Sequence, residues 1–284
     1  MAARQARPRG GGSDLGARVL VAVIAAPIAI VCVWKGDELF AVLLGVLGVI
    51  ALGELYTLME RVRPPALAGF LTLIALLVAA LYGDQRQVLM VLVAAFPVTY
   101  FLALARPRRA NVSWAIAATL FGVLWIGLPM AHAIWLRDLS TVQHGHEVQT
   151  GMGLVFDVLI ATFVADTCAY FVGRAYGRSP FAPLISPNKT LEGLVGGVLG
   201  GTLAFWCAGL YQDWLTGWDA LLIGFLVAIT APLGDLFESL IKRDLEVKDT
   251  GTLFGAHGGV LDRLDAVLFT IVVGYYAAVG LGYG

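Results

Sequence analysis

Long apolar segments separated by short polar connections dominate the hydrophobic pattern of this chain. A helix needs about 20 apolar residues to cross a bilayer, and nine segments approach or reach this length: residues 17–34, 39–59, 66–82, 88–105, 114–136, 152–173, 191–211, 218–241 and 265–283. The longest connections are residues 137–151, 174–190 and 242–264. The pattern predicts an all-α, polytopic integral membrane protein with about nine transmembrane helices.

The composition agrees with this prediction. Of 284 residues, 59% are hydrophobic and 14% are charged, which is typical of multi-pass membrane proteins. The formal net charge of −1 gives no positive field that would indicate a nucleic-acid partner. Residues 1–16 are basic and rich in glycine, and we expect them to form a disordered tail. Residues 17–136 supply about five helices, and residues 152–284 form a C-terminal half of about four.

The placement of Lys and Arg predicts the orientation in the membrane. If the N-terminus is cytoplasmic and nine spans follow, only three of the 19 Lys and Arg residues fall on the outer side, namely Lys35, Arg86 and Arg137. Positive residues are enriched in cytoplasmic loops, so this orientation is favoured and the C-terminus is predicted to lie outside. Loops 174–190 and 242–264 then face the cytoplasm, where nucleotides are found.

Residues 234–265 concentrate the reactive side chains of the C-terminal half. Four of them fall at positions i, i+3, i+4 and i+7, which is one face of a helix: Asp235, Glu238, Ser239 and Lys242. A polar run follows, and the next apolar segment begins with Asp262 and Asp265. Acids at the end of one helix and the start of the next can converge on one cation. The spacing therefore predicts a metal site at the membrane surface.

The same stretch also contains residues suited to phosphate. Arg243, Lys248 and His257 lie between the two groups of acids, and Arg263 follows the first acid of the second group. Lys and Arg are natural partners of a polyphosphate, and the Gly258-Gly259 pair can expose backbone N–H groups to an anion. By itself this glycine run would more often be a flexible loop. Its position between the acids favours a metal–phosphate site.

Another polar patch precedes the seventh apolar segment. Asn188 and Lys189 lie directly before Thr190, where a helix is predicted to begin. A helix N-terminus beside a lysine can bind phosphate, whereas ordinary capping by Thr190 explains part of the pattern equally well.

Three acids lie within or near the ends of other apolar segments. Asp166 lies inside the sixth one, and an acid within the membrane is a candidate functional residue, although pairing with Arg174 is a structural alternative. Glu54 and Asp157 lie near the ends of their segments, where contact of the side chain with water would explain them.

Three runs of residues at fixed spacing point to a known family. They are Ser239-Leu-Ile-Lys242-Arg243, Lys248-Asp249-Thr-Gly251 and Leu253-Phe-Gly255-Ala-His257-Gly258-Gly259-Val-Leu-Asp262-Arg263-Leu-Asp265. This pattern closely resembles the signature of the phosphatidate cytidylyltransferases, or CDP-diacylglycerol synthases. The patches around Asp166 and at residues 186–193 also resemble this family. The resemblance covers the chain from about residue 160 to its end, and the earlier segments match only in hydropathy.

The resemblance implies a reaction in phospholipid biosynthesis, in which CTP and phosphatidate give CDP-diacylglycerol and diphosphate. It implies Mg²⁺ as the cofactor, with Asp235 and Asp262 as principal ligands and Glu238 and Asp265 in support, and it leaves open a second metal. The implied catalytic residues are Asp235, Lys242, Asp262 and Asp265. The implied substrate-binding residues are Asn188, Lys189, Ser239, Arg243, Lys248, His257 and Arg263.

The resemblance also implies a homodimer surrounded by membrane lipids. The predicted architecture favours a bacterial inner membrane, and the predicted orientation favours an active site that faces the cytoplasm.

Two other functions explain part of the pattern. A CTP-dependent polyprenol or phytol kinase has a similar C-terminal half, but it would use an alcohol acceptor and the γ-phosphate, and the complete pattern at residues 239–265 argues against it. An ion-coupled transporter would explain Asp166 and Asp235 at membrane depth. It would not explain a loop dense in Lys, Arg, Gly and His between two pairs of acids.

Overall fold

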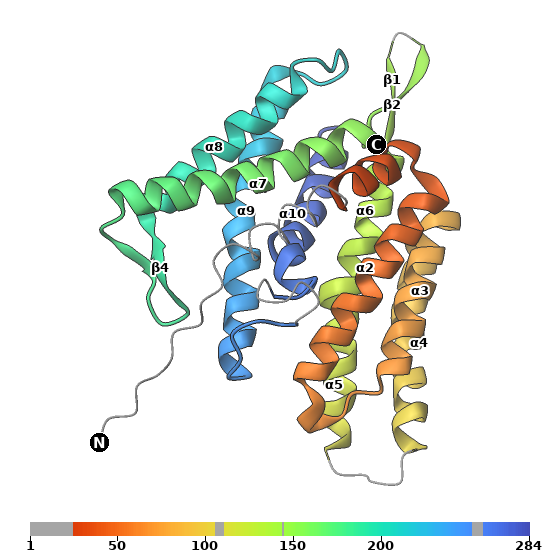
Figure 1. Cartoon of the computed structure of the whole chain (residues 1–284). Helices are drawn as coiled ribbons and strands as arrows, with labels where there is room; N and C mark the ends of the chain where they lie inside the picture. Colours follow the sequence, from red (N-terminus) through yellow and green to blue (C-terminus); the bar gives the residue numbers. More distant parts are fainter. Residues whose placement is uncertain (1–24, 106–110, 144, 252–257) are drawn as a thin grey trace, which may run out of the picture.

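The computed structural model describes residues 25–105, 111–143, 145–251 and 258–284. The tail predicted at residues 1–16, the start of the first predicted span and His257 lie outside these residues. Helices account for most of the described chain (Figure 1): Ala25–Lys35, α2 (Asp37–Leu58), η1 (Glu60–Val62), α3 (Ala66–Tyr82), α4 (Gln85–Leu104), α5 (Val112–Gly122), η2 (Val123–Gly127), α6 (Leu128–Asp138), α7 (Gly151–Tyr176), α8 (Leu191–Gly209), α9 (Gly217–Asp244) and α10 (Leu261–Gly280).

Within the described part of the chain, seven helical stretches are long and apolar enough to cross a membrane. They are α2, α4, the continuous stretch Val112–Asp138, α7, α8, α9 and α10. Helix α3 and the helix Ala25–Lys35 are apolar but shorter. The protein is therefore a helical, multi-pass membrane protein. The count of nine spans and the positions of the two termini relative to the membrane stay predictions.

Two of the connections predicted as plain loops contain β-hairpins, so the prediction of a purely helical chain was incomplete. Strands β1 (Ser140–Gln143) and β2 (His146–Gln149) pair with each other, and so do β3 (Pro180–Ala182) and β4 (Ser186–Thr190). Both pairs are antiparallel. The pairing satisfies backbone N–H and C=O groups that a helix no longer satisfies outside the spans. The strands are too short for the hydrophobic pattern to reveal them.

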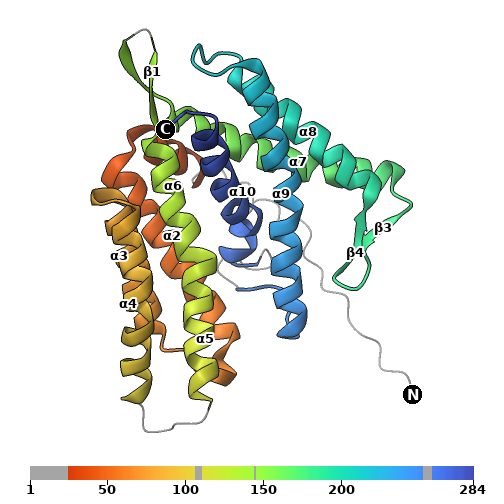
Figure 2. The same cartoon turned by 180° about the vertical axis from the view of Figure 1, so that it is seen from behind.

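The helices form two groups that meet at α9 and α10. In Figures 1 and 2, helices α2 to α6 gather on one side, and α7 and α8 lie side by side and cross the others obliquely. Helix α10 contacts both α6 and α9, and α9 contacts α8. The second hairpin, β3–β4, extends from the junction of α7 and α8 toward the C-terminal end of α9.

Small residues allow α8 to lie directly against its neighbours. Gly193, Gly197 and Gly201 recur at intervals of four residues and are buried. A Cβ atom on Gly197 would lie 2.8 Å from the carbonyl oxygen of Ala165 on α7, and one on Gly201 would lie 2.8 Å from the Cβ of Ala228 on α9. Such stripes of small residues bring helix backbones together in membranes, where packing rather than the hydrophobic effect drives association.

Asp157 differs from its prediction. The sequence placed it near the outer end of a span, where water would accommodate it, but the structure buries it fully. Its Oδ2 accepts a hydrogen bond of 2.7 Å from the side-chain amide of Gln212. The polar partner comes from the connection after α8, and only the tertiary structure shows that this connection folds over the end of α7.

We expect replacement of Gly201 by valine to destabilise the protein, because the added side chain would meet the backbone of α7 and the side chain of α9. Overpacking of this kind costs about 1–3 kcal/mol. The midpoint of thermal unfolding in detergent should fall for Gly201→Val. Gly280→Val is the control, since a Cβ atom at Gly280 has no neighbour within 4 Å. Equal midpoints for the two variants would contradict the close packing of α8.

Candidate functional site

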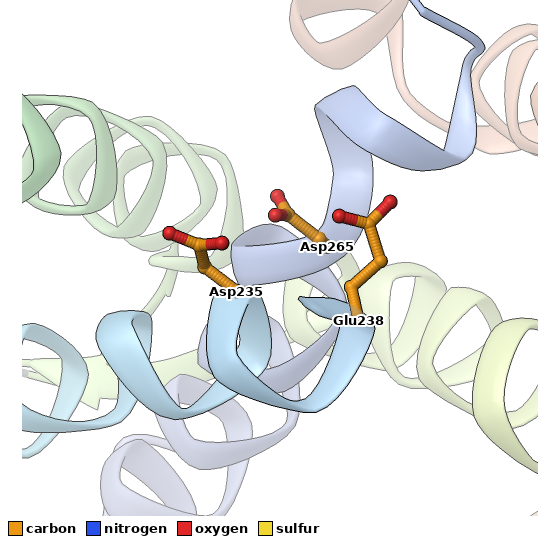
Figure 3. Close-up of side chains that lie close together, drawn as sticks. All are labelled: Asp235, Glu238 and Asp265. Atoms are coloured by element: carbon orange, nitrogen blue, oxygen red, sulfur yellow. The ribbon is translucent and has the colours of Figure 1, made fainter. Parts of the chain in front are cut away.

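Three acids from two helices form a cluster where α9 meets α10. Asp235 and Glu238 lie one turn apart on α9, and Asp265 lies in the second turn of α10 (Figure 3). One carboxylate oxygen of each can be chosen so that all three lie within 4.8 Å of one another. The close approach depends on Gly234, because a Cβ atom there would lie 2.9 Å from the Cα of Ala266. The geometry thus brings three hard oxygen ligands to one point.

The cluster holds more negative charge than its contacting cations neutralise. Glu238 is almost fully buried, at 1% exposure, and its Oε2 lies 2.7 Å from the Nζ of Lys242. Its second oxygen, Oε1, is buried and has no hydrogen-bond partner among the described residues. Asp235 Oδ2 lies 2.6 Å from the Nζ of Lys189, and Asp265 Oδ1 accepts from the backbone N–H of Ala266. Since a buried charge needs compensation, this arrangement favours a bound cation.

Asp262 lies beside this cluster but has different surroundings. Its Oδ1 is 2.8 Å from the Nζ of Lys242, and its Oδ2 accepts from the backbone N–H groups of Gly259 at 2.6 Å and Thr250 at 3.1 Å. The sequence assigned Asp235 and Asp262 as principal metal ligands and Glu238 and Asp265 as support. The structure groups Asp265 and Glu238 with Asp235, and it joins Asp262 to the lysine and to the connection before α10.

The hairpin β3–β4 brings the second predicted patch to the first. Lys189 is in β4, directly before α8, and its contact with Asp235 spans 46 residues of sequence. The Nε of Arg243 at the end of α9 donates to the carbonyl oxygen of Ile185 in the hairpin, at 3.3 Å. Asn188 is exposed in β4. Asp166 on α7 lies within electrostatic reach of both Asp235 and Lys189. Patches that are far apart in the sequence therefore surround one site.

The other predicted residues lie at its edge. Ser239 Oγ donates to Asp235 Oδ1 at 3.4 Å. Lys248 is exposed in the connection after α9, and Arg263 is in the first turn of α10. The loop conformation before α10 requires glycine at one position: Gly258 has a φ of +79°, and a Cβ atom there would collide with the carboxylate of Asp262.

Glu54 belongs to this region, although the sequence placed it merely at a water interface. It comes from the cytoplasmic-side end of α2 in the predicted orientation and accepts two hydrogen bonds of 2.9 Å, from the backbone N–H groups of Val260 and Leu261. These are orphan donors at the N-terminus of α10, where a negative charge is favourable. In the sequence, the signal for a role of Glu54 was its position as an acid in an apolar segment. Its partner was not visible because it lies 206 residues away.

A family model described as the cytidylyltransferase family matches residues 16–280. The chain belongs to this family. It is 30% identical over 272 residues to a phosphatidate cytidylyltransferase of Bacillus subtilis, with coverage of 93% of this chain and 97% of the relative. It is 38% identical over 176 residues to a phosphatidate cytidylyltransferase of Mycobacterium leprae, with coverage of 61% of this chain and 53% of the relative.

The cytidylyltransferase family match includes both helix groups of this chain, so the N-terminal helices are part of the family's architecture. The resemblance read from residues 239–265 is thereby confirmed at the level of the family. The chain spans about half the length of the Mycobacterium leprae relative and nearly the whole length of the Bacillus subtilis one. One physical role of the N-terminal helix group is visible in this chain: Glu54 of α2 accepts hydrogen bonds from the N-terminus of α10.

We expect Glu54→Leu to destabilise this cytidylyltransferase, because two buried backbone donors would lose a charged acceptor. Each such hydrogen bond contributes about 1.5–3 kcal/mol. The midpoint of thermal unfolding in detergent should fall for Glu54→Leu and fall less for Glu54→Gln, whose amide oxygen still accepts. Glu60→Leu serves as the control, since Glu60 is exposed. If Glu54→Leu and Glu60→Leu unfold at the same temperature, Glu54 does not anchor α10.

Proposed function

We propose that this protein transfers the cytidylyl group of CTP to phosphatidate, which gives CDP-diacylglycerol and diphosphate. The observation that carries the proposal is the cluster of Asp235, Glu238 and Asp265 at the junction of two apolar helices, with Lys189 and Lys242 in contact with it. The acids can bind a metal, and the lysines can bind phosphates. Because the acids lie on membrane-spanning helices, the site suits a reaction between a nucleotide and a lipid. Two relatives of the chain are named phosphatidate cytidylyltransferases, which supports the same substrates.

In this reaction a phosphate oxygen of the lipid attacks the α-phosphorus of CTP. A new P–O–P linkage forms, the bond from the α-phosphorus to the oxygen that bridges to the β-phosphorus breaks, and diphosphate leaves with the electron pair. The attacking phosphate is ionised near neutral pH, so the protein needs no strong general base. Its task is to bring two anions together and to neutralise their charge.

The residues of the cluster fit Mg²⁺. Three carboxylates supply hard oxygen ligands, and the unpaired buried oxygen of Glu238 has the character of a ligand atom. Mg²⁺ is usually held by a few carboxylates together with water and substrate phosphates. We therefore assign Asp235, Glu238 and Asp265 as its ligands. The bound ion would supply charge neutralisation at the phosphates and orient them for in-line attack.

Lysines and arginines around the cluster would bind the phosphates. Lys189 contacts Asp235, and Lys242 contacts Glu238 and Asp262, so both lysines are close to any phosphate bound at the cluster. We propose that Arg243, Lys248 and Arg263 share this role, with Asn188, Ser239 and His257 as further polar partners. Asp262 holds Lys242 and the connection before α10, so we propose that it acts as a positioning residue. Asp166 would adjust the charge around Lys189.

The location of the site supports further proposals. The acids lie at the end of α9 and the start of α10, which the distribution of Lys and Arg places on the cytoplasmic side. CTP would reach the site from the cytoplasm, and phosphatidate would come from the same leaflet of a bacterial inner membrane. The homodimer implied by the family resemblance remains part of this proposal.

The reaction is tested by incubation of the purified protein in detergent with CTP, phosphatidate and Mg²⁺. We expect diphosphate and CDP-diacylglycerol in equal amounts, and no product after chelation of the metal. Asp265→Asn should lower the rate at least about 100-fold, because it removes a metal ligand. Asp244→Asn, an exposed acid at the end of α9, should keep the rate. CDP formed from CTP with a polyprenol or phytol acceptor would instead establish the kinase.

The ligand assignment is tested separately by Mn²⁺ binding, followed by electron paramagnetic resonance. We expect Asp265→Asn to weaken Mn²⁺ binding strongly. Asp262→Asn should retain Mn²⁺ and lose about 10–100-fold in rate, because it displaces Lys242 rather than a ligand. Loss of Mn²⁺ from Asp262→Asn would return Asp262 to the role of principal ligand that the sequence assigned to it.

A further inference from the structure

An apolar groove of about 410 Å³ lies between the stretch α5–η2–α6 and helices α9 and α10. One wall is formed by the stretch α5–η2–α6, with Phe121, Trp125, Leu128 and His132 at helical spacing. The other wall is formed by α10 with Phe237 of α9. The π-helical segment η2 (Val123–Gly127) lies in the middle of the first wall, and such segments widen a helix locally and often occur at functional sites. The volume is that of a typical ligand site.

The chemistry of the groove selects an apolar occupant. Its lining is aliphatic and aromatic except for His132. Both ring nitrogens of His132 are already engaged within the protein: Nδ1 lies 2.8 Å from the carbonyl oxygen of Leu128, and Nε2 lies 3.2 Å from the hydroxyl of Tyr276. His132 therefore acts as a wall rather than as a partner for a polar ligand. Leu124 borders the groove and is 52% exposed, which leaves a side open toward the surrounding lipid.

One end of the groove lies about one helical turn from the acid cluster. Phe237 directly precedes Glu238 on α9, and Phe269 lies one turn after Asp265 on α10. The two rings contact each other, with centroids 5.4 Å apart. From there the lining continues along α10 to Val273, eight residues beyond Asp265, a distance of about 12 Å at 1.5 Å per residue. The groove thus runs along α10 from near the acids toward the middle of this apolar helix.

We infer that this groove holds one acyl chain of the lipid substrate while the lipid phosphate lies at the acid cluster. This inference rests on the proposed function. A lipid in the cytoplasmic leaflet has its phosphate at the surface and its chains toward the bilayer centre, which is the direction of the groove. The open side at Leu124 lets the chain enter from the bilayer without passing through water. The residues far from the acids, Val273 and Leu128, then decide how long a chain is accommodated.

The test is a competition between phosphatidates with two 10-carbon chains and with two 18-carbon chains, mixed in equal amounts in detergent micelles. Mass spectrometry of the two CDP-diacylglycerols gives the ratio of their kcat/KM values. Val273→Phe should lower the ratio of long-chain to short-chain product about tenfold, because methylene groups lose their place in the groove. Leu128→Phe fills the groove from the opposite wall and should act in the same direction.

Val279→Phe is the matched control, since Val279 is on α10 but 40% exposed outside the groove. It should keep the wild-type ratio. Wild-type ratios in both Val273→Phe and Leu128→Phe would overturn the inference and indicate that an ordinary membrane lipid or a second copy of the chain covers the groove. If the wild-type protein forms no product from either phosphatidate, the proposed function itself fails, and this outcome is distinct from an unchanged ratio.

Discussion

The contact between α9 and α10 is the constraint on which the rest of the site depends. It brings Asp235, Glu238 and Asp265 together within the apolar helices α9 and α10, where charged groups are costly. The contact is possible because Gly234 lets the backbone of α10 approach that of α9. Lys189 and Lys242 reduce the repulsion. The three carboxylates favour a bound cation, and the two lysines beside them favour a bound anion such as phosphate.

Three further contacts hold the residues at the junction of α9 and α10 in place. Glu54 from the N-terminal helix group accepts from the first backbone donors of α10. Asp262 joins the start of α10 to Lys242 on α9. The hairpin β3–β4 adds Lys189 from the side of α7 and α8. Because each helix group contributes a contact, the site is a property of the whole chain, in agreement with a family match over residues 16–280.

The site lies at a boundary between polar and apolar surroundings. Its charged residues lie where the polar connections begin, while Phe237 and Phe269, adjacent to the acids, already belong to an apolar groove. The proposed reaction between a soluble nucleotide and a bilayer lipid would need such a boundary, because neither substrate can leave its own solvent at low cost. In the wall of the groove, the π-helical segment η2 departs from regular α-helical geometry.

The sequence by itself determined the helical membrane class, because length and hydropathy are local properties of each segment. It also determined the family, because the spacing from Ser239 to Asp265 lies within one continuous stretch. Tertiary structure alone decided which acids meet: Asp262 and Asp265 have similar sequence signals, yet one faces Lys242 and the other the acid cluster. It also decided the roles of Glu54 and Asp157, since their partners lie 206 and 55 residues away. Hydrophobic periodicity carries no information about contacts at such separations, which arise only when the helices pack.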